Sequence, residues 1–220
     1  MLYTQDEIAT LLDCSGLLEL LPTAVRKQIV SLYGDDSRHY HDFDHAIEVL
    51  SWVVCALEEK PTLEPYTSLE VRLAALLHDV VYTVEGSPRN EEKSCAVTRT
   101  MLSEVVPEEA IDRVCELIML TAQHGKLEAE DVPLAGQLLL DADIANLGVA
   151  RWEIFLYNNR NVVAELRLKY SREQISKGRG MFFQGLLAKR SIYLSSWFRE
   201  RFEAQARKNI QRLLAEEFML

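Results

Sequence analysis

The sequence predicts an all-α fold, a bundle of about seven to nine helices. Apolar side chains recur at the spacing of one helix face in many segments, and no segment sustains the apolar–polar alternation of a half-buried strand. Proline and glycine separate the helical segments, as at Pro22, Pro107, Pro133 and the Gly178–Gly180 pair. There is no internal repeat, low-complexity tract or Gly/Ser linker, so we expect a single domain over residues 1–220.

Helix-start and helix-face patterns predict the elements of the first part of the chain. Residues 5–33 are expected to form one or two short helices. Apolar side chains at helical spacing predict a helix over residues 42–59. Thr67 with Glu70 fits a capping box, in which each side chain accepts the other's backbone N–H, so a helix is expected from here to about Tyr82.

The remaining helices are predicted from start signals, stop signals and apolar spacing. Asn90 is typical of an N-cap, and its helix is expected to run to about Val105. Pro107 suits the first turn of the next helix, which should end near His124 with Gly125 as its stop signal. Apolar spacing predicts further helices over residues 133–147, 150–170, 180–194 and 196–218.

Charge is distributed unevenly along the chain. The protein has 24 Lys and Arg against 34 Asp and Glu, a net charge of −10. Residues 1–150 hold 10 basic and 27 acidic side chains, whereas residues 151–220 hold 14 basic and 7 acidic ones. An acidic surface repels nucleic-acid backbones, so long nucleic acid is not expected as a partner. The basic part either packs on the acidic part, is solvated or salt-bridged, or supplies cations to an anionic ligand.

Targeting signals and cysteine spacing favour a cytoplasmic protein. The N-terminus lacks the basic and long apolar stretches of a secretory signal. No apolar run approaches the roughly 18 residues of a membrane span, so no membrane partner is expected. The four cysteines are far apart and form no metal-binding pair, as is typical of free thiols in a reducing compartment. Trp197, Phe198 and Phe202 of the last helix could pack internally or against a second copy, which leaves a homo-oligomer open.

The histidines carry the strongest functional signal. They are His39, His41, His45, His78 and His124. Three of them fall within the segment RHYHDFDH, and His78 is followed by Asp79 inside the apolar stretch LAALLHDVVY. Burying a carboxylate among apolar neighbours costs several kcal/mol unless it is paired or binds a cation. A metal ion would satisfy Asp79, and the adjacent histidine would share that ion.

Two further carboxylates interrupt the apolar segment LLLDADIANLG. If buried, Asp141 and Asp143 each need a counter-charge, so one is expected to cap or pair structurally and the other to be a hard oxygen ligand. Imidazole and carboxylate together suit divalent Mn, Fe, Co, Ni, Zn or Mg. His45 and Asp143 would then join the His78–Asp79 pair from other helices.

An ordered set of motifs resembles a known family. The segments RHYHDFDHAIEVL, LLHDVVY, NEEKSCA, LLDADIANLG and SKGRG follow one another as in the bacterial predicted metal-dependent HD superfamily phosphohydrolases. The resemblance runs from about residue 33 to 218 and implies an HD-domain-like helical bundle. Its metal-site core would span about residues 33–150, and the basic helices of residues 151–220 would pack on that core.

The resemblance also implies a ligand set for a divalent metal ion. The superfamily's H…HD…D pattern falls on His45, His78, Asp79 and Asp143. Relatives with two metal ions use extra histidines between the HD pair and the last aspartate, so His124 leaves a second ion open. The chain lacks a run of such histidines, which favours one ion per chain. The sequence does not decide among Mn, Fe, Ni, Co, Zn and Mg.

Other residues of these motifs are candidates for roles in a reaction. The candidate catalytic residues are Asp79, His41 and Glu91. Asp79 would orient or deprotonate the attacking water. The candidate substrate-binding residues are Arg38, His39, His124, Asn90, Lys126 and Arg179. The cations among them would stabilise phosphoryl charge. Structural roles remain open, namely a turn or helix cap for His39, His41 and Asn90 and a salt bridge for Arg38.

Together these inferences predict a hydrolase that cleaves a phosphomonoester or phosphoanhydride with metal-activated water. The chain has no P-loop and no dinucleotide fingerprint, and a small phosphorylated metabolite or nucleotide is the expected substrate. A di-iron oxygen enzyme would need about six histidine-rich ligands, more than the chain places well. A regulatory module that binds metal and a nucleotide or metabolite with little turnover stays open. Lys169 stands where the family tends to have a glutamate, which puts any structural pairing there in doubt.

Overall fold

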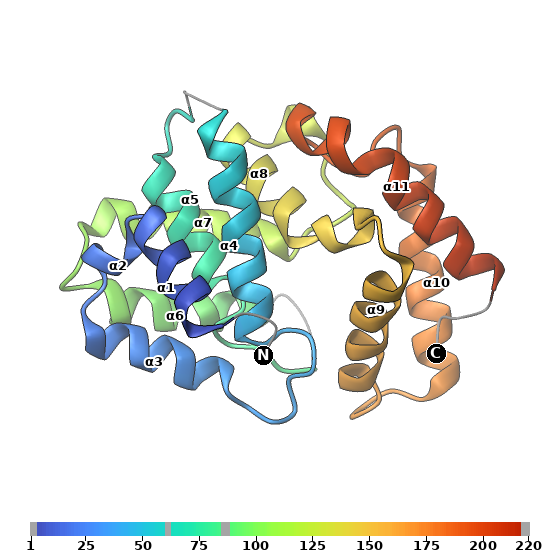
Figure 1. Cartoon of the computed structure of the whole chain (residues 1–220), viewed down its shortest axis with the longest axis horizontal. Helices are drawn as coiled ribbons and strands as arrows, with labels where there is room; N and C mark the ends of the chain where they lie inside the picture. The colour runs from blue at the N-terminus through green and yellow to red at the C-terminus, as the bar shows by residue number, and fades with distance from the viewer. Residues whose placement is uncertain (1–3, 60–62, 85–88, 217–220) are drawn as a thin grey trace.

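The computed structural model describes residues 4–59, 63–84 and 89–216, whose arrangement Figure 1 shows. In these residues the chain forms eleven α-helices and two 3-10 helices, and no β-strand. The all-α prediction is confirmed, although there are more helices than the expected seven to nine. Part of the difference arises at the N-terminus, where three short helices are present in place of the expected one or two. None of the described helices has the length and apolar character needed to cross a membrane.

Two backbone breaks divide the N-terminal segment. It folds as α1 (Gln5–Cys14), α2 (Leu17–Leu20) and α3 (Thr23–Tyr33). Gly16 separates α1 from α2 with a φ of 72°, a left-handed conformation that residues with a Cβ rarely adopt. Pro22 occupies the N-cap of α3 with φ −54° and ψ 149°, values at which a helix can start but not continue. One or two helices are expected here. Three are present because Gly16 and Pro22 each interrupt the helical backbone.

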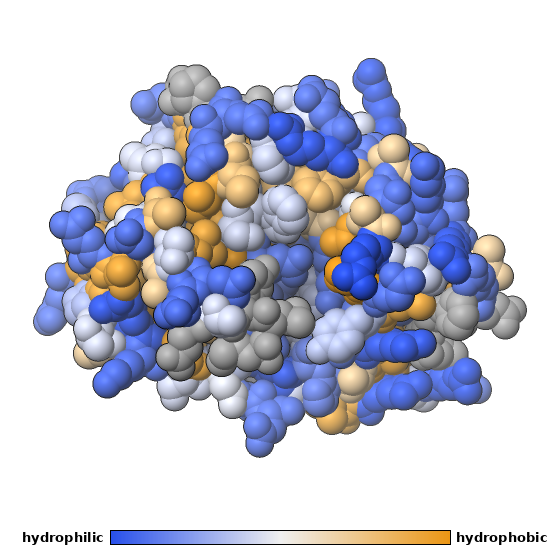
Figure 2. Space-filling model, in the orientation of Figure 1, coloured by the Kyte–Doolittle hydropathy of each residue, from blue (hydrophilic) through white to orange (hydrophobic). Residues whose placement is uncertain are grey.

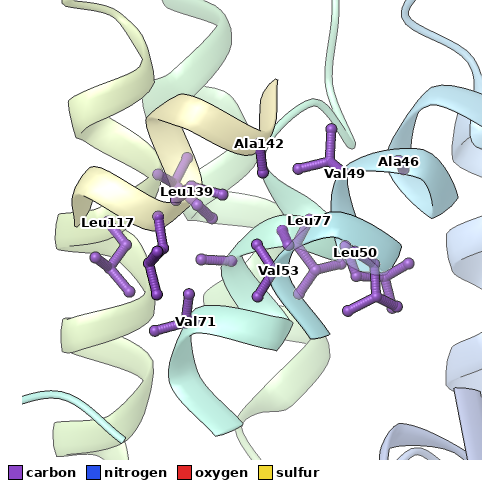
Figure 3. Packing of buried hydrophobic residues seen from close by; sticks show 14 of the residues in the cluster. Ala46, Val49, Leu50, Val53, Val71, Leu77, Leu117, Leu139 and Ala142 are labelled. Carbon is purple, nitrogen blue, oxygen red and sulfur yellow. The ribbon is translucent and has the colours of Figure 1, made fainter. Parts of the chain in front are cut away.

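The central core lies between four helices. They are α4 (Phe43–Glu58), α5 (Ser68–Leu77), α7 (Glu108–Thr121) and α8 (Leu134–Asp143). Figure 3 shows Leu50 and Val53 of α4 packed near Leu77 of α5, with Leu117 of α7 and Leu139 of α8 in the same layer. All five side chains are fully buried. Burial of each of these side chains contributes about 1.5–3 kcal/mol to stability. Their packing fixes α4, α5 and α8 relative to one another.

The helix α5 starts as predicted and ends early. Thr67 and Glu70 form the expected capping box. The helix stops at Leu77 instead of continuing to Tyr82, so His78 is its C-terminal cap and Asp79 lies beyond it. This early end matters for the site because it puts the His-Asp pair at a helix terminus.

The helix α6 (Arg89–Leu102) packs on α7 and begins before Asn90, so the predicted N-cap is wrong. The Asn90 side chain bonds to Thr83 instead. Its Oδ1 accepts the backbone N–H and the hydroxyl of Thr83 at 3.1 Å each, and its amide donates to the Thr83 carbonyl at 2.9 Å. The next helix, α7, stops at Thr121, a little before the expected end, and Gly125 then turns the chain with a φ of 74°.

The basic C-terminal third forms three longer helices. After the 3-10 helices η1 (Ala129–Asp131) and η2 (Ala145–Gly148) come α9 (Trp152–Leu166), α10 (Arg172–Ala188) and α11 (Ser196–Ala215). Figure 1 shows α9 and α10 on the opposite side of the molecule from α1 to α3, with α11 across the top. The helix α11 contacts η2 and α8. A Cβ at Gly148 would come within 2.6 Å of Phe202 Cβ, so this close approach requires glycine.

The position of α10 differs from the prediction of a helix over residues 180–194. Ser171 and Gln174 form a capping box that starts the helix at Arg172, and the Gly178–Gly180 pair lies inside it. Glycine in a helix interior costs about 1 kcal/mol, which is less than the burial of Ile175 and Phe183 contributes. The pair was therefore wrongly taken as a helix break.

The surface carries few large hydrophobic side chains. Figure 2 shows mostly hydrophilic residues on the face in view, with hydrophobic patches between them. Six large hydrophobic residues are exposed in the described part of the chain, and five of these lie on α9, on α10 or in the turn between the two helices. They are Ile154, Tyr157, Leu168, Met181 and Phe182.

Candidate metal centre

Three helix ends place the predicted metal ligands together. His45 lies in the first turn of α4, where the N-cap Asp42 accepts its backbone N–H at 3.1 Å. His78 caps the C-terminus of α5, Asp79 follows it, and Asp143 is the last residue of α8. The packing of the core thus brings His45 to Asp143, 98 residues further along the chain.

The ring nitrogens and carboxylate oxygens of these four residues converge. His45 Nε2 lies 3.0 Å from Asp143 Oδ1 and 3.9 Å from Asp79 Oδ2. His78 Nε2 lies 3.2 Å from Asp79 Oδ2 and 3.5 Å from Asp143 Oδ1. His45, His78 and Asp79 each offer one donor atom within 4.8 Å of the other two. Nitrogen and oxygen donors at these separations could hold a metal ion after small side-chain movements.

The tautomer of His78 tests whether this group suits a cation. Its Nδ1 lies 2.9 Å from the carbonyl oxygen of Ala75, which can only accept, so Nδ1 carries a hydrogen and the neutral ring has its lone pair on Nε2. Nε2 is buried and makes no hydrogen bond with the described residues, although Asp79 and Asp143 lie nearby. A lone pair facing two carboxylates is unfavourable without a positive charge between them. The residues therefore fit a divalent cation, and metal-binding histidines commonly fix their other nitrogen in this way.

The pKa values of the group reflect its crowded charges. Burial would lower the pKa of His78, but Asp79 and Asp143 raise it well above its ordinary value. Burial would raise the pKa of Asp79, but His78 and then His41 lower it to about 2. The pKa of Asp143 is held well below its usual range by His78 and His124, against the effect of burial. The two carboxylates therefore favour the protonated form of His78.

The two aspartates of LLLDADIANLG have different surroundings. Asp141 is 1% exposed and accepts the backbone N–H groups of Leu194 and Ser195 at 2.7 Å each. Burial raises its pKa to about 7, and these two hydrogen bonds oppose the rise. Asp143 faces the histidines instead. The tertiary structure thus separates a structural carboxylate from a candidate ligand.

His124 lies at the edge of the group. Its Nε2 is 2.6 Å from Asp143 Oδ2, and its side chain is 20% exposed. It therefore bonds to the carboxylate oxygen that His45 and His78 do not approach. Its predicted roles, in substrate binding or at a second ion, remain predictions.

A buried carboxylate that the sequence analysis missed organises the loop before α4. Glu165 of α9 is fully buried. Its Oε1 accepts the backbone N–H groups of His39, Tyr40 and His41 at 2.8, 2.7 and 2.9 Å. Its Oε2 lies 2.6 Å from His41 Nδ1, which leaves Nε2 as the free nitrogen of that ring. The His41 ring also stacks on Tyr82 at a centroid distance of 3.9 Å.

Arg38 joins this loop to the His-Asp turn. Its guanidinium donates to the backbone carbonyls of His41, Asp79 and Val80 at 3.2, 2.8 and 3.2 Å. The Cζ atom also lies 5.2 Å from the centre of the Tyr33 ring. With three carbonyls as partners, Arg38 is placed to position the candidate ligand Asp79.

Four other predicted residues lie outside the immediate group. Asn90 binds Thr83, as described above. Glu91 is 8% exposed, and its Oε2 is buried without a hydrogen-bond partner among the described residues. Lys126 is exposed, as is His39. Their proposed contributions to catalysis or substrate binding remain predictions.

A pocket of about 270 Å³ opens beside Asp143 and His124. His41 and Tyr40 line it from the loop before α4, and Arg179 is the one lysine or arginine among its described lining residues. Its apolar wall consists of Ile144, Leu147, Phe155, Val162, Phe182 and Phe183. The amides of Asn146, Asn158 and Asn159 complete the lining. Of the predicted site residues, the structure thus gathers His41, His124 and Arg179 at one pocket with Asp143.

No family model, curated protein or solved structure matches this chain.

Proposed function

We propose that this protein is a metal-dependent phosphohydrolase of the HD-domain type, acting on a small phosphorylated metabolite or nucleotide. The observation that carries the proposal is the convergence of His45, His78, Asp79 and Asp143, with the unpaired Nε2 of His78 facing two carboxylates. The adjoining pocket supports it, because a substrate there would lie against Asp143.

The four residues would hold one divalent ion. Mixed imidazole and carboxylate ligands suit Mn, Fe, Ni, Co, Zn or Mg. When bound, such an ion lowers the pKa of water and attracts phosphoryl oxygens. Its charge would also take over the role of the proton on His78. In this proposal His124 stays outside the ligand set and binds substrate.

The surrounding residues would move protons. Water attacks phosphorus, the ester P–O bond breaks, and the leaving oxygen takes up a proton. Asp79, a partly buried carboxylate with a low pKa, would accept a hydrogen bond from the attacking water and orient it. His41 is the candidate acid. Glu165 holds its Nδ1, and although burial would lower the pKa of His41, this carboxylate and Asp79 raise it. The other nitrogen, Nε2, is therefore available to protonate the leaving oxygen.

Metal content and turnover test the proposal together. Elemental mass spectrometry of the purified protein should find about one divalent metal ion per chain. His78→Ala and Asp143→Ala should each lose it, together with hydrolysis of phenyl phosphate and of a panel of nucleoside monophosphates. His39→Ala is the matched control, because His39 is an exposed histidine of the same motif, and it should keep its metal.

Each contrary outcome has a definite meaning. No bound metal after incubation with Mn, Ni, Fe or Zn would overturn the proposed site. Full metal content in both alanine variants would overturn the ligand assignment. Metal and tight nucleotide binding without any turnover would overturn the hydrolase and establish the regulatory module in its place.

A further inference from the structure

Arg179 lines the pocket without a negatively charged partner in the described part of the chain. Its guanidinium donates to Asn159 Oδ1, and its Cζ lies 5.0 Å from the centre of the Phe183 ring. Its Nε is buried with no hydrogen-bond partner, and no carboxylate of the described residues pairs with it. Burial lowers the pKa of Arg179 to about 10, so the group still carries its charge at neutral pH.

Two other partly buried arginines have more partners within the described residues, although the Arg38 Nε is also buried without one. Arg38 reaches three backbone carbonyls, and Arg207 binds Glu203 as well as the carbonyls of Leu187 and Lys189. A desolvated cation without such partners is costly, and the cost falls when an anion enters the same space. The planar guanidinium matches phosphate oxygens better than a lysine ammonium does.

The pocket wall around Arg179 is also aromatic. Phe155 and Phe183 are buried in it, whereas Phe182 is 39% exposed at the same pocket. Arg179 and Phe182 also line a neighbouring apolar pocket of about 450 Å³ with Leu166 and Ile175. An exposed aromatic ring beside two adjoining pockets suits a planar apolar group, which would stack on it.

The size of the first pocket limits the ligand. Its volume of about 270 Å³ is just below the usual range of ligand pockets, roughly 300–1,000 Å³. A single phosphate with one ring system fits this space, and a long oligonucleotide does not.

We propose that Arg179 forms the anion-binding part of this pocket, and that the substrate is a phosphomonoester with an aromatic or heteroaromatic group packed against Phe182. The inference rests on the proposed function for the reaction it serves. The binding it describes can be measured without turnover. In this proposal Arg179 is the cation of the basic C-terminal third that binds the anionic ligand.

Two phosphonates, which are not cleaved at their C–P bond, test this pocket by calorimetry. Phenylphosphonate and methylphosphonate carry the same anion and differ only in the apolar group. Wild-type metal-loaded protein should bind phenylphosphonate about 5- to 20-fold more tightly than methylphosphonate. Arg179→Gln should weaken both about 10- to 100-fold. Phe182→Ala should remove most of the preference for phenyl and leave methylphosphonate binding within about twofold.

Two further variants keep the experiment interpretable. Arg179→Lys retains the charge without the planar fork, so it should give intermediate affinities even if Arg179→Gln does not fold. Arg160→Gln removes an exposed arginine of α9 and should bind both ligands as the wild type does. Affinities of Arg179→Gln and Arg179→Lys within twofold of wild type would overturn the anion site. Equal binding of the two phosphonates by the wild type would overturn the aromatic substrate class.

The outcomes separate this inference from the proposed function. Arg179-dependent phosphonate binding in a protein that never hydrolyses phenyl phosphate would uphold the pocket and overturn the hydrolase. Hydrolysis that needs His78 and Asp143 but keeps its kcat/KM in both Arg179 variants would uphold the hydrolase and overturn the pocket.

Discussion

Replacing Glu165 with glutamine tests the connection between α9 and the candidate metal centre. The carboxylate is fully buried and accepts hydrogen bonds from three backbone N–H groups and from His41 Nδ1. Hydrogen bonds to charged groups contribute about 1.5–3 kcal/mol, and neutral ones about 0.5–1.5 kcal/mol. The amide could keep the backbone bonds only as neutral ones, and it would turn an NH2 group toward His41. We expect a loss of about 3–5 kcal/mol, as for other broken buried charge pairs.

Urea and thermal unfolding measure this loss. In a chain of 220 residues it corresponds to a fall in Tm of about 10 °C. The matched control is Glu153→Gln, an exposed position on the same helix, which should change stability by about 0.5 kcal/mol or less. If Glu165→Gln unfolds within about 1 kcal/mol of the wild type, or if the control loses as much, the reasoning from this network is refuted.

The stability loss should depend on pH with a definite sign. Burial would raise the pKa of Glu165, but His41 lowers it below its ordinary value of 4.5. Its stabilisation is thus present above pH 4.5 and is lost as the pH falls through the lower folded-state pKa. Burial would lower the pKa of His41, but Glu165 raises it above 6.5, so that contribution is present below pH 6.5 and is lost as the pH rises through the folded-state pKa. The difference between wild type and variant should be largest between about pH 4.5 and 6.5.

Three further results are expected. The affinity of the metal-free protein for a divalent ion should rise as the pH rises above about 6.5, because the ion must displace the proton on His78, whose pKa is raised well above that value; calorimetric titration checks this, and a constant affinity would contradict it. Asp141→Asn should lower the free energy of unfolding in urea by about 1–3 kcal/mol, because each carboxylate oxygen accepts one backbone N–H and the NH2 group that replaces one of them cannot accept, yet it should keep its metal by elemental analysis, unlike Asp143→Asn. Arg38→Ala should weaken metal binding about 10- to 100-fold, because Arg38 donates to the Asp79 backbone carbonyl. Competition with a chelating dye measures this affinity, and an unchanged value would show that the contact does not position Asp79.

The converging residues could be predicted from the sequence because their signal is local. Asp79 and Asp143 interrupt apolar stretches, where a carboxylate needs a partner, and His78 adjoins the first of them. The choice between Asp141 and Asp143 has no such local signal, since both lie in one apolar helix. Contact of Asp141 with the chain before α11 decides between them.

Helical periodicity predicts that Glu165 is buried but does not predict its partners. Phe155, Asn158, Val162 and Glu165 follow helical spacing, so the inward face of α9 already includes this carboxylate. Its partners lie 124 to 126 residues earlier in the chain. No periodic pattern within α9 can indicate that a loop at this distance supplies three N–H groups.

By itself the sequence determined the helical class, the capping box of α5 and the His78–Asp79 pair in an apolar stretch, because apolar spacing, caps and buried charges act over a few neighbouring residues. Only the tertiary structure decided that α5 ends at Leu77, that α10 runs through two glycines, and that Arg179 rather than Arg38 lines the pocket. The reason is energetic. Helix propensities differ by about 1 kcal/mol or less per residue, whereas packing and buried hydrogen bonds between distant segments contribute several times as much.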